Sequence, residues 1–416
     1  MHISKLELKD IGVFDHLVIE FGRKLRADLA DIHILTGING TGKSTILYAL
    51  SGAIDDYSII KRFRNENSYI SVHYEQKDKT PFAVTLHSHE RSNDTNEIKM
   101  YWQIHTRQKD INKEPLDFLF VGYSGYRTIT SEKIESIKEI NEHPLSSTLR
   151  FDRPTDSRLI LQWIANTKAK IAFSYQEGKT EDAKKYEESI KKIESSIEQI
   201  TGCEVKFIFH YKTMEVKIKI NKDELEFDLL PDGLKSIISW IADLLILLDR
   251  VPWKDDMDIL DRNLILFLDE IEVHLHPAWQ RKILPVIQKL FKNAQIFIAT
   301  HSPFVAGSVE HAWIYKLDIE NGAGVLKERI ETQAGKSYPS IIDNIFGIDE
   351  YFDVETECQL DRFYNLRSEL LNGNMHNYDE FVALARELAE KSVEVRDIIG
   401  RELRQFSRIT GKEVLL

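Results

Sequence analysis

A glycine-rich segment near the N-terminus carries the residue types that bind phosphate. Gly37–Thr45 reads G-I-N-G-T-G-K-S-T and fits the pattern G-x-x-x-x-G-K-[ST] in full. In such a loop the backbone N–H groups face the phosphates, and the lysine places its charge on the terminal ones. We predict that the phosphates of a nucleotide are bound by Asn39, Gly40, Thr41, Gly42, Lys43, Ser44 and Thr45, with the Ser44 hydroxyl as a ligand of Mg²⁺.

The segments around this loop supply the context that a phosphate site requires. The apolar segment His33–Thr36 precedes the loop, and Ile46–Leu50 follows it with a helical composition. A helix N-terminus presents unpaired N–H groups and the positive end of the helix dipole. The order strand, loop, helix therefore favours a bound anion over an ordinary glycine turn.

Polar residues that could act on a nucleotide follow two further apolar runs. Leu264–Leu268 is apolar throughout, as in a strand covered on both faces, and Asp269 and Glu270 come directly after it. We predict that Asp269 holds Mg²⁺ and that Glu270 orients or deprotonates the attacking water. The third run, Gln295–Thr300, ends at His301. Because ligands bind at the carboxyl ends of parallel strands, we expect His301 to contact the γ-phosphate.

Two other features allow two interpretations each. His274 and His276 are two residues apart, which could indicate a metal site, but Pro277 and the lack of further ligands favour a capped loop. Arg127 follows a buried strand and a glycine loop. It could sense the γ-phosphate or simply belong to a turn, and the sequence favours neither.

Composition limits the class of protein. The chain has 416 residues, 42% of them hydrophobic, which is enough for a large core. Its 55 basic and 67 acidic residues give a net charge of −12, so direct DNA binding, which stays open, would need a local basic patch. Cys203 and Cys358 form neither a disulfide framework nor a zinc site. We expect a cytoplasmic protein without a signal peptide, since its longest apolar run, Ile237–Leu248, is shorter than the ~20 residues that span a membrane.

The pattern along the chain predicts a mixed α/β fold. Two short strands, within residues 3–10 and 17–21, precede the phosphate loop and can pair as a hairpin. Strands at 68–74, 82–87 and 98–106 predict an antiparallel β subdomain beside the nucleotide. The segment 118–125 is a buried strand that leads into a glycine loop.

The middle and the end of the chain have helical patterns. A Lys/Glu-rich stretch from 155 to 200 predicts a helical pair broken near Gly178, with one face made by Ile190, Ile193, Ile197 and Ile200. Its charges favour the solvated face of a hairpin over an arm that meets DNA or a partner. Strands at 205–209 and 216–220 follow, and helical periodicity returns from 351 to 416, with apolar positions at Leu360, Phe363, Leu366, Phe381, Leu384 and Leu388.

The segment Leu230–Ser236 precedes a long apolar helix. This segment, the phosphate loop, the Asp269–Glu270 pair and the run ending at His301 occur in the order found in ABC-type ATPase heads of the SMC/RecF-like class. The chain resembles that class over about residues 1–320. The resemblance implies a Walker A loop, a Walker B pair, the switch histidine His301, and a dimer that sandwiches two ATP molecules. It further implies that Asp232 and Gly233, in the signature loop, cap the ATP of the partner copy. Pro231 stands where the family usually has serine, which implies slow turnover.

The compact head and the segment Glu270–Gln280 resemble more closely the ATPases of anti-phage systems, among them OLD-like proteins and the PtuA subunits of Septu systems. The resemblance implies an ATPase that regulates a separate effector nuclease of the HNH type, docked on the C-terminal helices. A DNA-repair ATPase of the RecF type and an OLD-like nuclease-associated ATPase are the alternatives. No second acidic constellation with nuclease spacing follows His301, and the acidic run 349–357 is better interpreted as a solvated face.

We therefore expect four parts in the chain. Residues 1–154 form the N-terminal half of the ATPase head, and residues 155–202 form a helical hairpin insertion. Residues 203–340 form the C-terminal half of the head. Residues 341–416 form a C-terminal helical region that binds the partner.

Overall fold

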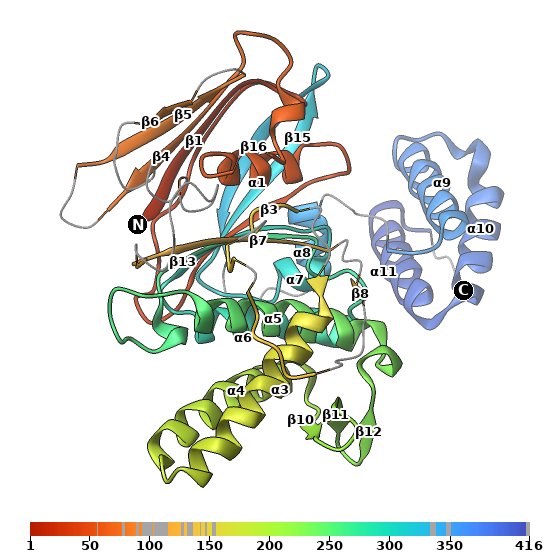
Figure 1. Cartoon of the computed structure of the whole chain (residues 1–416). Helices are drawn as coiled ribbons and strands as arrows, with labels where there is room; N and C mark the ends of the chain where they lie inside the picture. The colour runs from red at the N-terminus through yellow and green to blue at the C-terminus, as the bar shows by residue number, and fades with distance from the viewer. Residues whose placement is uncertain are drawn as a thin grey trace. The chain divides into compact units, whose positions relative to one another are not determined.

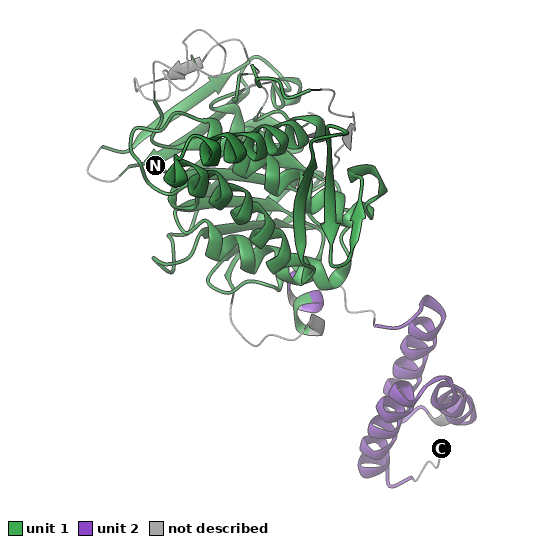
Figure 2. Ribbon diagram, turned by 60° about the horizontal axis from the view of Figure 1, so that its bottom comes forward, with its two compact units in different colours: residues 1–341 green, residues 342–416 purple. Residues whose placement is uncertain are grey.

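A computed structural model of the chain describes residues 1–55, 57–76, 80–88, 91–93, 103, 115–125, 129–130, 136–141, 143–145, 148–151, 155–332, 338–346 and 351–412. It contains two compact units, residues 1–341 and 342–416, which Figures 1 and 2 show. The predicted strand at 98–106 lies outside the described residues except for Gln103, and so does Arg127.

The first unit is built on a six-stranded sheet of order β16-β15-β3-β14-β13-β7, in which only the edge strand β16 is antiparallel to its neighbour. Every residue of β3, β13 and β14 is buried, as their apolar runs predict for strands covered on both faces. The strands are β3 (Asp31–Thr36), β7 (Leu119–Ser124), β13 (Leu264–Asp269), β14 (Ala294–Ala299), β15 (Trp313–Glu320) and β16 (Ala323–Glu331).

A second, antiparallel sheet has the order β2-β1-β4-β5-β6. Its strands are β1 (His2–Ile11), β2 (Phe14–Glu20), β4 (Tyr69–Glu75), β5 (Phe82–His87) and β6 (Arg91–Asn93). The predicted hairpin is confirmed, since β1 and β2 pair antiparallel across the turn. The apolar residues of β1 are buried and most of its polar residues are at least partly exposed, which is the pattern of a sheet with one face in the core.

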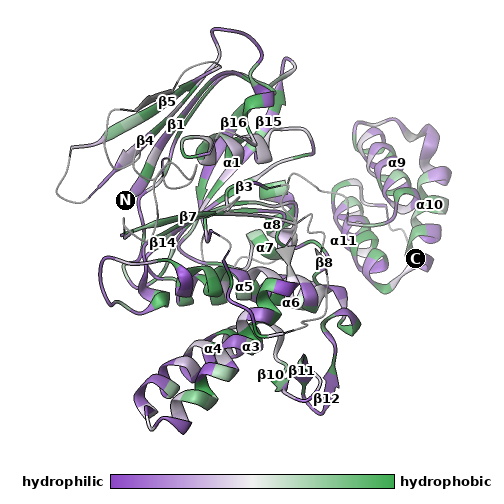
Figure 3. Cartoon of the chain, viewed as in Figure 1, coloured by the Kyte–Doolittle hydropathy of each residue, from purple (hydrophilic) through white to green (hydrophobic). Residues whose placement is uncertain are grey.

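Helices cover the central sheet. They are α1 (Lys43–Gly52), α5 (Asp232–Arg250), α6 (Pro277–Leu290) and the short α7 (Pro303–Ala306). Nearly all of α5 is buried, which explains why its apolar residues run around the helix and do not form one stripe. In Figure 3, α5 accordingly shows much more hydrophobic colour than the charged helices near it.

The predicted helical pair is present as α3 (Ser157–Gln176) and α4 (Thr180–Thr201), and Gly178 makes the turn between them with φ 76°. The isoleucine face of α4 is buried where the helix packs against α3, α5 and α6. Its lysines and glutamates are largely exposed, as expected for the solvated face of a hairpin. A three-stranded sheet follows, made of β10 (Val205–His210), β11 (Glu215–Ile220) and β12 (Asp223–Leu225).

The second unit is a helical bundle, as the periodicity of the C-terminal region predicts. Its long helices are α9 (Val354–Leu371), α10 (Tyr378–Lys391) and α11 (Val393–Thr410). The side chains of Phe363, Phe381 and Phe406 meet in its core, with ring centroids 4.9 and 5.1 Å apart along that series. The bundle therefore has a hydrophobic core of its own.

Shorter elements complete the described chain. They are β8 (Ile129–Thr130), β9 (Thr155–Asp156), α8 (Tyr338–Ile341), a π-helical turn (Ile342–Phe346) and 3₁₀ turns at Ile60–Arg62, Phe227–Leu229, Ile259–Asp261 and Met375–Asn377. The predicted fold class is confirmed: an α/β ATPase-like head with an antiparallel β subdomain, a short helical insertion and C-terminal helices. Within the described residues, no helix has the length and apolar character needed to cross a bilayer.

Candidate nucleotide site

The glycine-rich loop connects β3 to α1 at the carboxyl edge of the central sheet. Gly42 has φ 92°, and a Cβ there would lie 2.4 Å from the Phe14 ring, so only glycine fits. Asn39 and Gly40 are exposed at the tip of the loop. The first N–H groups of α1 have no partner within the helix, and these are the groups that a phosphate would accept.

Lys43 is folded against its own loop. Its side chain is buried, and its ammonium donates hydrogen bonds to the carbonyl oxygens of Gly37 at 2.8 Å and Ile38 at 2.9 Å. Burial lowers the pKa of Lys43 to about 8, although Glu270 and Asp269 act in the opposite direction. Lys43 is therefore mostly charged at pH 7 and can exchange these carbonyls for phosphate oxygens.

Ser44 and Asp269 meet across the site. The Ser44 hydroxyl donates to Asp269 Oδ1 at 3.0 Å, and the Tyr48 hydroxyl donates to Asp269 Oδ2 at 3.3 Å. Burial raises the pKa of Asp269 to about 6, despite the hydrogen bond from Ser44. A hydroxyl and a carboxylate oxygen side by side are hard oxygen ligands, and they fit Mg²⁺.

Glu270 and His301 lie next to this pair. Glu270 Oε1 is 3.6 Å from His301 Nε2, and about a third of each side chain is exposed, so water can reach both. Burial lowers the pKa of His301, and the charge of Lys43 acts in the same direction. The lowered pKa favours the neutral imidazole, which has one N–H to donate.

Two buried features fix these residues in place. Glu272 Oε1 accepts hydrogen bonds from the Thr300 hydroxyl at 2.5 Å and from the His301 backbone N–H at 3.0 Å. Gly125, at the end of β7, donates its N–H to the Asp269 carbonyl at 2.6 Å. A Cβ on Gly125 would lie 2.1 Å from the Glu270 carbonyl oxygen, so the two loops approach as closely as glycine allows.

The structure thus brings Lys43, Ser44, Asp269, Glu270 and His301 together. Thr45 is different, because its hydroxyl accepts a hydrogen bond from Arg62 and only its backbone faces the loop as a donor. The sequence analysis missed Tyr48, Glu272 and Gly125 as parts of the site. Tyr48 had a local signal, since it lies one helical turn after Ser44 and so shares its face of α1.

The signature residues make other contacts. Asp232 and Gly233 begin α5, and a Cβ on Gly233 would lie 2.7 Å from the His274 carbonyl oxygen and 3.1 Å from the Trp279 ring. The Asp232 side chain is exposed and lies 3.6 Å from Lys235. Among the hydrogen bonds and ion pairs of the described residues, none joins Asp232 or Gly233 to the phosphate loop.

One of the two histidines of the Walker B loop, His276, caps a helix. His276 precedes α6, and its Nδ1 accepts a hydrogen bond from the Ala278 N–H at 3.2 Å. The interpretation as a capped loop is therefore confirmed.

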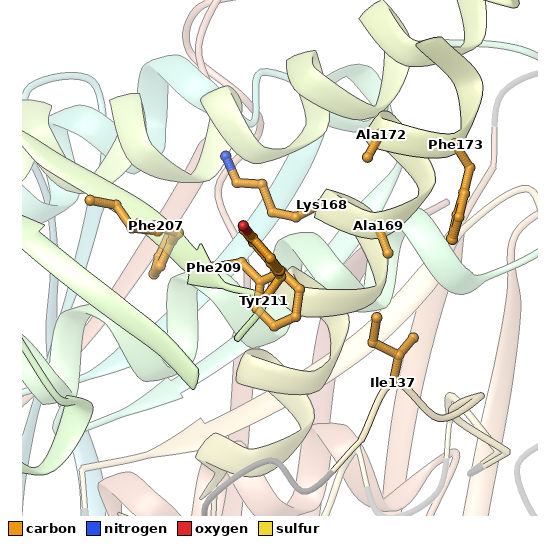
Figure 4. Close-up of a pocket in the computed structure, with 9 residues that line it drawn as sticks. Ile137, Lys168, Ala169, Ala172, Phe173, Phe207, Phe209 and Tyr211 are labelled. Carbon is orange, nitrogen blue, oxygen red and sulfur yellow. The ribbon is translucent and has the colours of Figure 1, made fainter. Parts of the chain in front are cut away.

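A cavity of about 550 Å³ lies away from the nucleotide site, between α3 and the β10 strand (Figure 4). Its lining residues are mostly apolar, and Figure 4 shows Phe209 and Tyr211 near the stem of Lys168, with Phe173 farther away next to Ala172. It is lined by Ile137, Lys168, Ala169, Ala172, Phe173, Phe207, Ile208, Phe209 and Tyr211. None of the predicted nucleotide-binding residues contributes to it.

Comparisons with known proteins agree with this geometry. One model of an AAA domain matches residues 1–70. A second AAA-domain model, whose description refers to the AbiEii toxin of type IV toxin–antitoxin systems, matches residues 113–307. Together with the Walker residues and the parallel sheet, these two partial matches indicate an ATPase head of the AAA/ABC type. ATP binding is implied by that class.

The chain is a distant relative of the Septu PtuA proteins and the retron ATPases. It is 23% identical over 379 residues to the Septu protein PtuA of Bacillus thuringiensis, and this alignment covers 86% of this chain and 88% of that protein. It is 23% identical over 383 residues to the retron Vc95 probable ATPase of Vibrio cholerae, covering 74% and 72% of the two chains. A crystal structure of an SMC head bound to the C-winged helix domain of ScpA aligns with a TM-score of 0.49 at 14% identity, covering 80% of this chain and 98% of that one.

Proposed function

We propose that the chain hydrolyses ATP, that ATP joins two copies of it, and that the ATP-bound state regulates a separate effector nuclease in anti-phage defence. The observation that carries the proposal is the convergence of Lys43, Ser44, Asp269, Glu270 and His301 at one sheet edge. The relatives among Septu and retron proteins support the defence role over DNA repair.

Each side chain has a distinct task in this proposal. Lys43 leaves the Gly37 and Ile38 carbonyls to bind the terminal phosphates. Ser44 and Asp269 hold Mg²⁺, which supplies neutralisation of the phosphate charge. Glu270 orients a water molecule and accepts its proton, and the neutral His301 donates a hydrogen bond to the γ-phosphate.

The hydrolysis step is tested by Glu270→Gln. This change keeps the size of the side chain and removes the base, so we expect turnover to fall by roughly 10²–10⁴-fold. ATP affinity should stay within about threefold, because the phosphate ligands are intact. Steady-state phosphate release and calorimetric ATP titration measure the two quantities. Turnover at the wild-type rate would show that Glu270 is not the base.

The dimer is tested at the exposed cap. Gly233→Asp is unsuitable, because its side chain would strike the His274 carbonyl within the same copy. Asp232→Trp adds bulk at a side chain that is 80% exposed, so the fold should tolerate it. Glu181→Trp is a matched control, since Glu181 is also 80% exposed and also pairs with a lysine three residues later.

We expect Asp232→Trp to bind ATP but to lose the ATP-dependent dimer, while Glu181→Trp keeps it. Light scattering in the Glu270→Gln background, where ATP persists, measures the mass directly. Equal dimerisation of both tryptophan variants would rule out the sandwich arrangement.

The C-terminal bundle offers a surface for the effector. Val354 and Val393, the first residues of α9 and α11, are 88% and 72% exposed. They belong to the same end of the bundle, because Lys391 Nζ lies 3.6 Å from Glu355 Oε1 and 3.2 Å from Thr356 Oγ1. Docking of a partner would remove the apolar surface of these two exposed valines from water, which is favourable. We therefore assign the HNH-type nuclease to this end of the bundle.

Where an HNH-type nuclease is encoded next to this chain, this docking is tested by co-expressing the two proteins. The double variant Val354→Lys with Val393→Lys should no longer copurify with the nuclease. Ile409→Lys, at the other end of α11 and 61% exposed, should copurify as the wild type does. Retention of the nuclease by the double variant would exclude this surface.

A further inference from the structure

A cluster of two histidines and an aspartate lies at the amino end of β3, at the opposite end of the strand from the phosphate loop. His2 comes from β1 of the antiparallel sheet, and Asp31 and His33 come from β3 of the central sheet. His2 Nε2 lies 2.7 Å from Asp31 Oδ2, and His33 Nε2 lies 3.1 Å from the same oxygen. The three atoms lie within 4.8 Å of one another.

A fourth side chain, Gln295, makes the hydrogen bonding of this cluster inconsistent. Its Oε1 accepts from the Ile3 N–H at 2.7 Å and its Nε2 donates to the Ile3 carbonyl at 2.9 Å, so its orientation is fixed. The second N–H of Gln295 then faces His2 Nε2 at 3.0 Å and His33 Nε2 at 3.2 Å. Gln295 can only donate there, and it needs an imidazole nitrogen that carries no proton.

Asp31 makes the opposite demand on the same two nitrogens. A carboxylate oxygen only accepts, so its contacts with His2 and His33 require a proton on each Nε2. With Asp31 ionised, every assignment of protons therefore leaves each of the two Nε2 atoms with one contact between like groups. A proton on Asp31 does not remove the conflict, because it would use the one lone pair that Gln295 needs. A cation among the three atoms would take the place of the protons that Asp31 requires on the two imidazoles and engage all three lone pairs at once. It would satisfy the Asp31 contacts, while the second N–H of Gln295 would need another acceptor.

The other side of His33 is arranged as in metal sites. Its Nδ1 lies 3.1 Å from the Tyr315 hydroxyl, which also accepts the Gly22 N–H at 2.8 Å. A hydrogen bond from Nδ1 to such an oxygen fixes the tautomer and leaves the Nε2 lone pair for a metal. The ring also stacks on Phe297, with centroids 4.9 Å apart and planes at 16°, which fixes its direction.

We propose that His2, Asp31 and His33 bind a divalent transition-metal cation, with Zn²⁺ as the best match. Two imidazoles and one carboxylate are a Zn²⁺ ligand set, whereas Mg²⁺ and Ca²⁺ prefer oxygen alone. Asp31 and His33 are buried and His2 is 28% exposed, so the cation enters past His2 and water completes its coordination. The metal would link the antiparallel sheet to the central sheet.

The test uses the full chain with a C-terminal tag that contains no histidines, stripped of metal by a chelator. The background is Asp269→Asn, so that the nucleotide site cannot hold the cation. Calorimetric titration should show one Zn²⁺ per chain and much weaker binding of Mg²⁺. His2→Gln, which changes a partly exposed residue and so spares the core, should lower the Zn²⁺ affinity at least about a hundredfold.

A matched control separates the site from chance binding at surface histidines. His210 is exposed and also lies near a carboxylate, 3.2 Å from Glu224, and His210→Gln should leave the Zn²⁺ affinity unchanged. Saturating Zn²⁺ should raise the melting temperature of the parent and of His210→Gln, but not that of His2→Gln. Absence of stoichiometric binding, or equal affinity in His2→Gln and the parent, would overturn the proposal.

Discussion

The two ends of β3 hold buried charges in opposite ways. At the carboxyl end, burial raises the pKa of Asp269 to about 6 and lowers the pKa of Lys43 to about 8, so both charges are held at a cost. At the amino end, burial also opposes the charge of Asp31, but His33 and His2 outweigh it and hold the pKa of that carboxyl well below its usual range.

The difference shows what each end is built for. The carboxyl end keeps poorly compensated charges ready for a ligand that arrives and leaves, as functional sites commonly do. The amino end pairs its carboxylate within the protein and joins two sheets. The site at the carboxyl end of β3 therefore lowers the stability of the fold, and the Asp31 cluster at its amino end raises it.

Lys43→Ala gives the largest expected effect and should act at one end only. We expect ATP affinity to fall at least about a thousandfold, because the change removes the charged donor that we propose for the terminal phosphates. Calorimetric titrations with ATP and with Zn²⁺ in separate samples measure the two ends, with the Zn²⁺ titration done without nucleotide and in the Asp269→Asn background. The Zn²⁺ affinity should equal that of the unchanged chain. A loss of both ATP affinity and Zn²⁺ affinity would mean that the two sites are coupled through β3.

Replacing each aspartate by asparagine should shift stability in opposite directions. The folded-state pKa of Asp269 is raised, so its ionisation opposes folding at pH 7.5, and Asp269→Asn should stabilise the ligand-free protein by about 1–3 kcal/mol. The folded-state pKa of Asp31 is depressed, so its charge favours folding at that pH and Asp31→Asn should destabilise by a similar amount.

Thermal unfolding without metal or nucleotide measures both variants against the parent. The Asp31 contribution is present above the unfolded pKa and is lost as the pH falls through the depressed folded value. The free-energy cost of ionising the buried Asp269 carboxyl is present in full above pH 6, and it disappears as the carboxyl is protonated at lower pH. Melting shifts of the same sign would refute the contrast between the two ends.

The smallest effect is the pH dependence of ATP binding in the presence of Mg²⁺. Asp269 must be ionised to hold the cation, so affinity should fall by about tenfold between pH 7 and pH 5 as it is protonated around pH 6. In Asp269→Asn this dependence should largely vanish, although the affinity itself is lower. An affinity that stays constant across this range in the parent would show that Asp269 does not hold Mg²⁺.

The sequence predicts the carboxyl end well because each residue there follows directly from a local pattern. Lys43 and Ser44 lie in a contiguous motif, and Asp269 and His301 each follow an apolar run that can only be a buried strand. The part that Glu272 plays in the site could not be predicted in this way. Its direction depends on the backbone at Glu270, which has φ 51°, and no local pattern signals such a conformation.

The amino-end cluster could not be predicted for a different reason. His2 and Asp31 are far apart in sequence and meet only where β1 packs on the central sheet. The spacing of Asp31 and His33 places them on one face of a strand, but alternation alone does not indicate a ligand set. The order of the parallel strands was hidden in the same way, since β3 pairs with β14 and β15, which come much later in the chain.

The tight contact at Gly233 has a consequence for how two copies would work together. The start of α5 lies against the His274 carbonyl, in the loop that begins with Glu270, and against the Trp279 ring, in α6. Within one copy, we therefore expect the proposed cap and the proposed base, Glu270, to move together. In the proposed dimer, each cap serves the other copy's nucleotide, so closure at one site places the base at the second. We expect positive cooperativity in ATP turnover, with a Hill coefficient above one that Asp232→Trp reduces to one.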